Sequence, residues 1–91
     1  MNVTCFPNPF SNEITITFNL PVKGKVEMDV VNQTGQTVRT ILKNTELSSG
    51  RQRFTWDGTN ENHQRVSPGI YYLKLKLNNQ FIISKIVKTD R

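Results

Sequence analysis

Hydrophobic and polar residues alternate along most of this chain, and such alternation predicts half-buried β-strands. The clearest case is Glu13–Leu20, in which every second residue is apolar. One face of this strand is expected to be buried, and the other face, with Thr15 and Thr17, is expected to be exposed. The same pattern predicts seven strands, namely Val3–Phe6, Glu13–Leu20, Lys25–Val31, Thr37–Leu42, Arg51–Trp56, Gly69–Leu77 and Phe81–Lys88.

Turn-forming residues separate the expected strands, and no stretch shows a helical period. Asn78-Asn79 predicts a tight hairpin, because Asn tolerates the left-handed backbone that such turns require. The polar segment Asn44–Gly50 is expected to be a loop. Ile41-Leu42 breaks the alternation, so a bulge or a strand end is expected there.

The stretch Phe54–Leu77 is expected to hold the centre of the core. Phe54 and Trp56 are two residues apart, so an extended backbone directs both rings to the same face. Asp57-Gly58 ends this strand, since Asp bonds to its own following backbone and Gly tolerates positive φ. The stretch contains the only Trp and both Tyr residues of the chain.

The last expected strand is apolar on both faces. Phe81, Ile83 and Val87 share one face, with Lys85 between them in a nominally inward position. Ile82 and Ile86 occupy the other face, which suggests that another part of the chain or a partner covers the strand. Lys85 in an inward position would pack its stem while its ammonium group reaches water.

Short strands, regular turn signals and the lack of helical pattern predict an all-β fold, an antiparallel β-sandwich. The 91 residues suit one domain spanning 1–91. The single Cys excludes an internal disulfide. No apolar stretch approaches the ~20 residues that span a bilayer, and no signal peptide is expected at the start of the chain.

The chain is basic, with a net charge of +5 and a pI near 9.7. Such charge allows weak attraction to nucleic acid. The lysines alternate with apolar residues, however, which favours a solvated strand face, and exposed aromatics for base stacking are scarce. We therefore expect no nucleic-acid partner. Five basic residues cluster in the last two strands and beyond, namely Lys74, Lys76, Lys85, Lys88 and Arg91.

The sequence predicts no catalytic residue and no cofactor. The only His, His63, lies in a polar loop and cannot supply both a base and its orienting partner. Cys5 lies in an apolar run and is expected to be a small buried hydrophobe. Glu27 and Asp29 share a strand face, where solvated surface is favoured over a glycosidase pair. The other carboxylates, Glu13, Glu46, Asp57, Glu61 and Asp90, form no pair by spacing.

Oxygen-bearing side chains in the segment 57–62 raise the possibility of a calcium loop. The EF-hand pattern fails, because Asn62 stands where Gly is required and Pro68 stands where Glu is required. The favoured interpretation is that Asp57 caps the loop through backbone N–H groups.

Three segments, taken together and in this order, resemble the C-terminal sorting domain of the type IX (Por) secretion system. They are Phe6-Pro7-Asn8-Pro9-Phe10, Gly69-Ile70-Tyr71 and Lys85-Ile86-Val87-Lys88. A further pair of motifs is similar to the Ig-like domain of flagellar hook-capping proteins. This pair is Trp56-Asp57-Gly58 followed by Pro68-Gly69-Ile70-Tyr71.

The resemblance implies a non-catalytic, seven-stranded Ig-like sandwich at the C-terminus of an exported protein. The parent would cross the periplasm of a Gram-negative bacterium and end at the cell surface or in the medium. Outer-membrane translocon components would recognise the domain, and a surface sortase would cleave it. Gly69 and Tyr71 match one family motif, and Lys85, Ile86, Val87 and Lys88 match the terminal one.

Alternatives remain open at this stage. Thr89-Asp90-Arg91 extends beyond the point where many sorting domains end, and Trp56-Asp57-Gly58 is closer to the hook-capping style. A structural or adhesive Ig-like module is therefore the second interpretation. A carbohydrate-binding sandwich is the third, and it would need an exposed aromatic platform, for which only Tyr72 is available. The last strand could accept another chain by strand addition, or it could be an ordinary sheet strand. The oligomeric state is also open.

Overall fold

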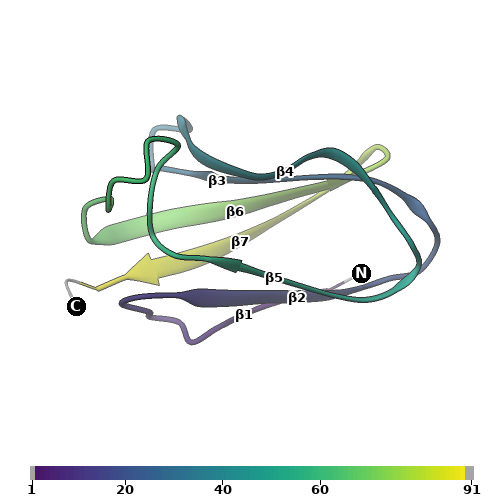
Figure 1. The fold of residues 1–91 in the computed structure, drawn as a ribbon, viewed down its shortest axis with the longest axis horizontal. Helices are drawn as coiled ribbons and strands as arrows, with labels where there is room; N and C mark the ends of the chain where they lie inside the picture. Colours follow the sequence, from purple (N-terminus) through teal and green to yellow (C-terminus); the bar gives the residue numbers. More distant parts are fainter. Residues whose placement is uncertain (1, 90–91) are drawn as a thin grey trace.

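The computed structural model describes residues 2–89, which contain seven β-strands and no helix (Figure 1). Asp90 and Arg91, named above among the acidic and basic residues, lie outside the described range. The strands are β1 (Val3–Phe6), β2 (Ile14–Leu20), β3 (Gly24–Val31), β4 (Thr37–Leu47), β5 (Gly50–Trp56), β6 (Gly69–Leu77) and β7 (Gln80–Lys88).

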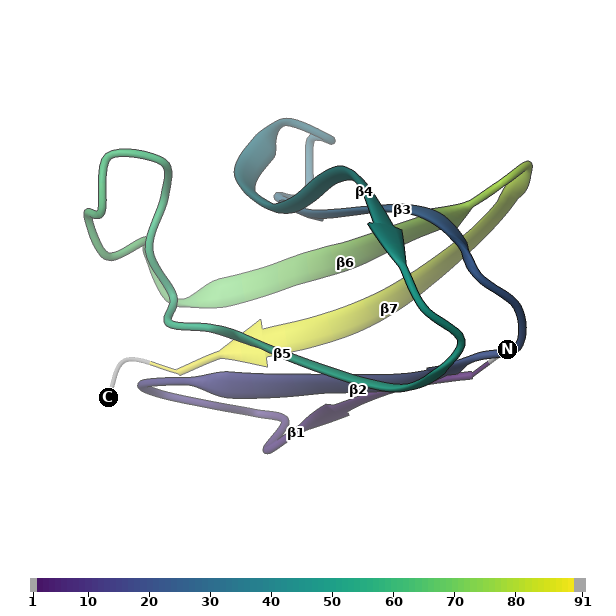
Figure 2. The ribbon, with the colours of Figure 1, turned by 45° about the vertical axis from the view of Figure 1, so that its right-hand side comes forward.

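The strands form two sheets that stack face to face (Figure 2). One sheet has three strands in the order β1-β2-β5, and the other has four strands in the order β4-β3-β6-β7. All neighbouring strands within each sheet are antiparallel. The expected all-β, Ig-like sandwich of about seven strands is confirmed.

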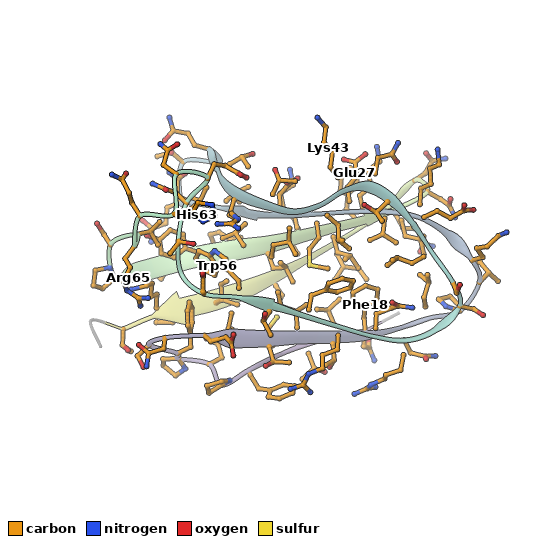
Figure 3. The ribbon with its side chains drawn as sticks, viewed as in Figure 1. Phe18, Glu27, Lys43, Trp56, His63 and Arg65 are labelled. Carbon is orange, nitrogen blue, oxygen red and sulfur yellow. The ribbon has the colours of Figure 1, made fainter. Side chains whose placement is uncertain are left out.

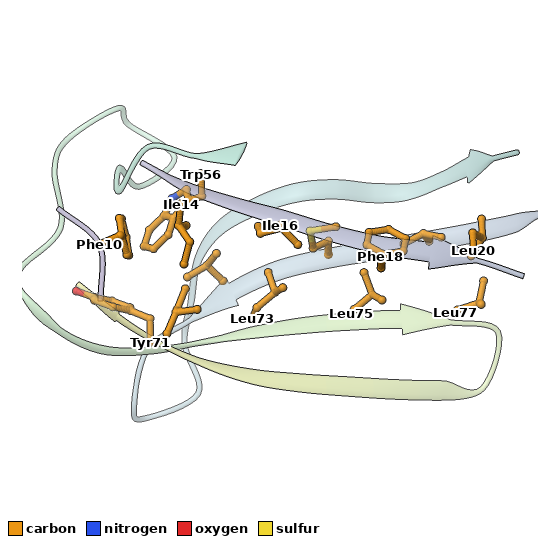
Figure 4. Packing of buried hydrophobic residues seen from close by; sticks show 14 residues of the cluster. Phe10, Ile14, Ile16, Phe18, Leu20, Trp56, Tyr71, Leu73, Leu75 and Leu77 are labelled. Atoms are coloured by element: carbon orange, nitrogen blue, oxygen red, sulfur yellow. The ribbon is translucent and has the colours of Figure 1, made fainter. Parts of the chain in front are cut away.

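The core fills the space between the two sheets, and β2 and β6 supply most of it (Figure 4). Both strands alternate strictly, so alternate side chains point to the opposite sheet. Figure 3 shows Phe18 and Trp56 between the sheets and Lys43 pointing away from them. The buried hydrophobic cluster consists of Phe10, Ile14, Ile16, Phe18, Leu20, Val26, Met28, Val30, Trp56, Tyr71, Leu73, Leu75, Leu77 and Ile86.

The fourth strand is longer than the sequence pattern predicts. It continues to Leu47, so the expected loop Asn44–Gly50 shrinks to the two residues between β4 and β5. β4 is the outer strand of its sheet, where polar residues can pair with β3 while their side chains face solvent. The expected bulge is confirmed: Met28 pairs with Leu42 and Asp29 pairs with Thr40, which leaves Ile41 without an opposite residue.

Thr15 and Thr17 were expected to be exposed, and this expectation is wrong. Both lie on the outer face of β2, yet only 9% and 4% of their surfaces are exposed. β2 is the central strand of its sheet, so residues on β1 and β5 flank both threonines. Phe6 lies opposite Thr15 and Arg53 lies opposite Thr17, and these long side chains can cover their small neighbours.

Candidate functional site

The connection between β1 and β2 lies along the outer edge of β7. The Asn8 side chain bonds twice to this edge: its Nδ2 donates to the Lys85 carbonyl at 3.0 Å, and its Oδ1 accepts from the Val87 amide at 2.9 Å. Lys85 and Val87 are two residues apart, so their groups are those that a neighbouring strand would bond. One side-chain amide thus replaces one peptide unit of a missing strand.

The main chain of Phe10 continues this pairing. Its N–H donates to the Val87 carbonyl at 2.9 Å, and its carbonyl accepts from the Thr89 amide at 2.8 Å. Phe10 and Lys88 form a parallel bridge. We call residues 7–10 the latch, because they hold the end of β7 against the three-stranded sheet.

The sequence of the latch explains why a side chain, that of Asn8, bonds to the edge of β7. Pro7 and Pro9 have no backbone N–H, so neither residue can donate to the edge of a strand. Asn8 stands between them and supplies a donor and an acceptor from its amide group. Phe10 then turns its ring inward, where it is 2% exposed and packs 5.5 Å from the Trp56 ring.

The loop after Trp56 is ordered by its own polar groups. The Trp56 Nε1 donates to the Thr59 carbonyl at 2.9 Å. The Asp57 carboxylate accepts from both the amide and the hydroxyl of Thr59, which confirms the expected cap. Chiefly because of the Thr59 hydroxyl bond, the pKa of Asp57 lies below its ordinary value. Arg39 donates to the Thr59 hydroxyl at 3.0 Å and ties this loop to β4.

The same loop contacts the latch side of the molecule and the end of β7. Arg65 donates to the carbonyls of Ser11 and Asp57, at 2.6 and 3.2 Å. Lys88 is only 4% exposed, and its side chain passes directly beneath Gly58. A Cβ on Gly58 would lie 2.9 Å from the Lys88 Cε, and the φ of Gly58 is +77°. Gly at this position therefore serves both the turn and the close approach of Lys88.

The two faces of β7 are reversed relative to the expectation from the sequence. Ile82, Ser84, Ile86 and Lys88 face the other sheet, whereas Phe81, Ile83, Lys85 and Val87 face outward. Lys85 is thus exposed and does not occupy an inward position. The register with β6 determines this phase, because the buried Tyr71 and Leu75 lie opposite Ile86 and Ile82.

The residues of the two family motifs meet on β6 and β7. Gly69 pairs with Lys88, and Tyr71 pairs with Ile86. Tyr71, Ile86 and Lys88 are buried, whereas Lys85 is exposed and both Gly69 and Val87 are half-buried. The structure therefore brings the whole set together but leaves only part of it accessible.

Tyr71 has a structural partner that the sequence pattern did not indicate. Its hydroxyl donates to the Ser67 carbonyl at 2.6 Å, four residues upstream. A Tyr near the start of this strand makes the same kind of bond in the tyrosine corner of Ig-like sandwiches. Burial raises the pKa of Tyr71.

Two residues of the first family motif make contacts that the sequence did not predict, because they lie outside any alternating pattern. Asn8 and Phe10 stand in the segment Pro7–Asn12, where prolines and polar residues obscure a strand signal. Their roles depend on β7, which is distant in the sequence. The two residues that Asn8 contacts, Lys85 and Val87, lie 77 and 79 positions after it. No local sequence signal reports such a contact.

Cys5 and His63 belong to residue types that can act as nucleophiles, bases or metal ligands. Cys5 is half-buried, packs against the core and contacts the Ser84 hydroxyl at 3.9 Å. Burial raises the pKa of its thiol. His63 is exposed in the loop beyond Trp56 (Figure 3). Within residues 2–89 no three His, Cys, Asp or Glu side chains form a group that could hold a metal ion. In the same range no helix has the length and apolarity needed to cross a membrane.

The family of this chain is shown by residues 10–80, which match the family model of the FlgD Ig-like domain. The chain belongs to this family. The matched region runs from the buried Phe10 through the Trp56 loop to the start of β7. Comparison with curated protein sequences gave no match.

Solved structures that are similar to this chain include two proteins of Porphyromonas gingivalis. The chain is similar to part of latent PorU from Porphyromonas gingivalis, with a TM-score of 0.78, 17% identity, and coverage of 98% of this chain and 9% of PorU. PorZ of the same organism is an essential surface component of its type-IX secretion system. Its TM-score is 0.69, with 16% identity and coverage of 97% of this chain and 11% of PorZ.

The hook-capping protein family gives a comparable likeness. FlgD from P. aeruginosa has a TM-score of 0.64 and 21% identity, and the match covers 84% of this chain and 61% of FlgD. This chain therefore spans less than two thirds of each of these proteins. At such identities the likenesses establish a shared fold.

Proposed function

We propose that this chain is a non-catalytic sorting domain that directs its parent protein through the type IX translocon. The parent would pass through the periplasm of a Gram-negative bacterium to the cell surface or the medium. The partners would be outer-membrane translocon components and a surface sortase. The fold shared with PorZ and PorU supports the proposal.

One structural observation carries the proposal furthest. The first and last family motifs, Phe6–Phe10 and Lys85–Lys88, are joined by the latch hydrogen bonds along β7. They therefore form one structural unit at one edge of the sandwich. On this unit Lys85 and Val87 face outward, so their side chains are the accessible part of the terminal motif.

An export assay tests the proposal. Residues 1–91 are fused to the C-terminus of a periplasm-directed fluorescent reporter in a bacterium with a working type IX system. We expect the reporter at the cell surface or in the medium. Removal of Lys85–Arg91 would not separate recognition from folding, because Ile86 belongs to the core. Point variants of exposed residues are therefore required.

Lys85→Glu is the informative variant, and Lys43→Glu is its control. Both lysines are exposed on strands, but Lys43 lies on β4 at the far edge of the same sheet. We expect Lys85→Glu to retain the reporter in the periplasm and Lys43→Glu to leave export unchanged. Equal export of both variants would show that Lys85 is not part of the recognition surface. Retention of the folded wild-type fusion would reject the sorting function.

A structural Ig-like module is the second candidate, and the family match supports it equally. The Trp56-Asp57-Gly58 loop lies inside the matched region and is built from internal hydrogen bonds. Such a module would act as a hook-capping-type domain or as a spacer in a surface or extracellular protein. A folded domain that leaves the reporter in the periplasm would favour this function.

A further inference from the structure

The latch covers only the second half of the outer edge of β7. Its partners are backbone groups of Lys85, Val87 and Thr89. Alternate residues of a strand direct their N–H and C=O groups to the same edge, so those of Phe81 and Ile83 point there too. Within residues 2–89, β6 is the only strand that pairs with β7, and the Phe10–Lys88 bridge lies at the other end of β7. No described group bonds to the edge at Phe81 and Ile83.

The side chains of this open stretch are apolar and exposed. Phe81 is 59% exposed and Ile83 is 61% exposed. Figures 1 and 2 both show the hairpin end of β6 and β7 diverging from the three-stranded sheet, so that sheet does not cover it. Natural proteins usually protect such an edge with Pro, charge or a bulge. The β6–β7 register is continuous, and none of these protections falls within Phe81–Ser84.

We propose that this stretch pairs with the same stretch of a second copy of the chain. The two β7 strands would run antiparallel about a two-fold axis at Ile82 and join the two four-stranded sheets into one. Phe81 of each copy would lie opposite Ile83 of the other, and Ile82 would lie opposite Ile82. This self-pairing is independent of the secretion role.

The register follows from which backbone groups are free. An antiparallel pair bonds only groups that face the shared edge, so Phe81 and Ile83 must meet residues of the same phase. A two-fold axis at Ile83 would place Phe81 opposite Lys85, whose carbonyl already accepts from Asn8. An axis at Ser84 would require Val87, whose amide and carbonyl are both bonded to the latch. The axis at Ile82 uses the free groups of Phe81 and Ile83 on both copies.

The charges beside this stretch do not single out an anionic surface, and they permit pairing with a second copy. Lys74 and Lys76 lie beside Phe81, with their ammonium groups 5.9 and 5.6 Å from its ring centroid. Across the sheet they lie opposite Asp29 and Glu27, which offset their charge. In the proposed register Lys85 lies opposite Asn79, so no two like charges face each other across the pair.

Sedimentation of the 91-residue chain over a range of concentrations tests the pairing. We expect a monomer–dimer equilibrium that Ile83→Lys weakens about tenfold or more, because Lys replaces an apolar cross-strand contact. Val22→Lys is the matched control, since Val22 is 59% exposed but lies between β2 and β3. It should leave the equilibrium unchanged. Higher salt should strengthen the dimer, because each copy carries +5.

Two measurements test the register itself. Amide exchange at Phe81 and Ile83 should slow as the protein concentration rises. In a Cys5→Ser background, Ile82→Cys should form an intermolecular disulfide and Val22→Cys should not. Directly opposed residues of this kind lie about 4.5 Å apart at Cα, which suits a disulfide.

Three results would overturn the proposal. The first is a chain that stays monomeric at all concentrations, with fast exchange at Phe81 and Ile83. The second is an open-ended assembly, or a dimer that Ile83→Lys does not weaken. The third is binding to phosphatidylglycerol vesicles that Ile83→Lys abolishes, without any dimer, which would assign the stretch to an anionic membrane.

Discussion

Trp56 connects three parts of the molecule through one side chain. Its ring packs 5.5 Å from Phe10 of the latch and 5.7 Å from Tyr71 of β6. Its indole N–H is satisfied by the Thr59 carbonyl. The residue therefore combines the burial of a large aromatic with a hydrogen bond that orders the following loop.

Trp56→Ala should lower the free energy of unfolding by about 3–5 kcal/mol, the usual loss for a buried large aromatic. This approaches the whole stability of a small domain. Phe54→Ala, on the same strand and face but half-buried, should cost clearly less. Urea unfolding followed by far-UV circular dichroism measures both variants. A shift of only a few degrees in the Tm of Trp56→Ala would show that the ring does not support the core.

Asp57 makes stability depend on acid pH. Hydrogen bonding from Thr59 lowers the pKa of the folded carboxyl, so its contribution is present above the unfolded pKa and is lost as pH falls through the folded pKa. Asp57→Asn should cost about 0.5–1 kcal/mol at pH 7, since the carboxylate is largely solvated. The variant should also lose less stability than wild type between neutral and acid pH. Parallel Tm–pH curves for the two proteins would contradict this prediction.

At the level of elements, the loop after β5 packs against the end of β7. Gly58 and Lys88 meet where a Cβ has no room. Gly35 has a similar backbone, with a φ of +89°, but nothing lies within 4 Å of its Cβ position. The two glycines therefore separate backbone strain from the contact with Lys88.

Gly58→Ala should destabilise the fold more than Gly35→Ala. Positive φ alone should cost about 1–2 kcal/mol at either position. Gly58→Ala should add the cost of displacing the buried Lys88 side chain. Denaturant unfolding of both variants gives the difference, and Gly58→Ala in a Lys88→Ala background should reduce it. Equal losses of stability in the two variants would mean that the Lys88 side chain can move aside without a measurable cost.

The elements with strict alternation are those that the sequence predicts well. Gly69–Leu77 has the predicted bounds, and Glu13–Leu20 differs by one residue. In both strands a buried face opposes a polar one, so the period of two determines which side chains enter the core. Asn78-Asn79 likewise forms the expected hairpin, with Asn78 at a φ of 56°.

Where neighbouring strands determine whether a side chain is buried, the sequence pattern alone does not predict its burial. β7 is apolar on both faces, so only its pairing with β6 determines that Lys85 points outward. Thr17 is buried because β2 is central, and the polar end of β4 is a strand because it lies at a sheet edge. The latch contacts join residues almost a whole chain apart, and local periodicity carries no information about them.

At the scale of the whole molecule, the latch joins the beginning of the chain to its end. It also bridges the two sheets, since β1 belongs to one sheet and β7 to the other. The bridge relies on the two hydrogen bonds of the Asn8 side chain together with those of the Phe10 main chain. The stability of the last strand therefore depends on a residue near the N-terminus.

Asn8→Ala should cost about 1–3 kcal/mol, because two hydrogen bonds to the β7 edge are lost. Asn12→Ala is the control, since Asn12 is exposed in the same connection. Asn8→Asp should retain the bond from the Val87 amide, but its ionised carboxylate cannot donate to the Lys85 carbonyl. The Asn8→Asp variant should therefore be less stable than wild type at neutral pH, and it should recover part of this lost stability when the introduced carboxyl is protonated at acid pH.

Amide exchange distinguishes this local effect from general destabilisation. In Asn8→Ala the Val87 amide should exchange faster than the amides of β2, whose partners are unchanged. The variant should also associate more strongly than wild type, because it adds the freed Lys85 carbonyl and Val87 amide to the open edge at Phe81 and Ile83. Uniform acceleration of exchange across both sheets, with unchanged association, would show that Asn8 supports the fold as a whole and does not protect the edge of β7.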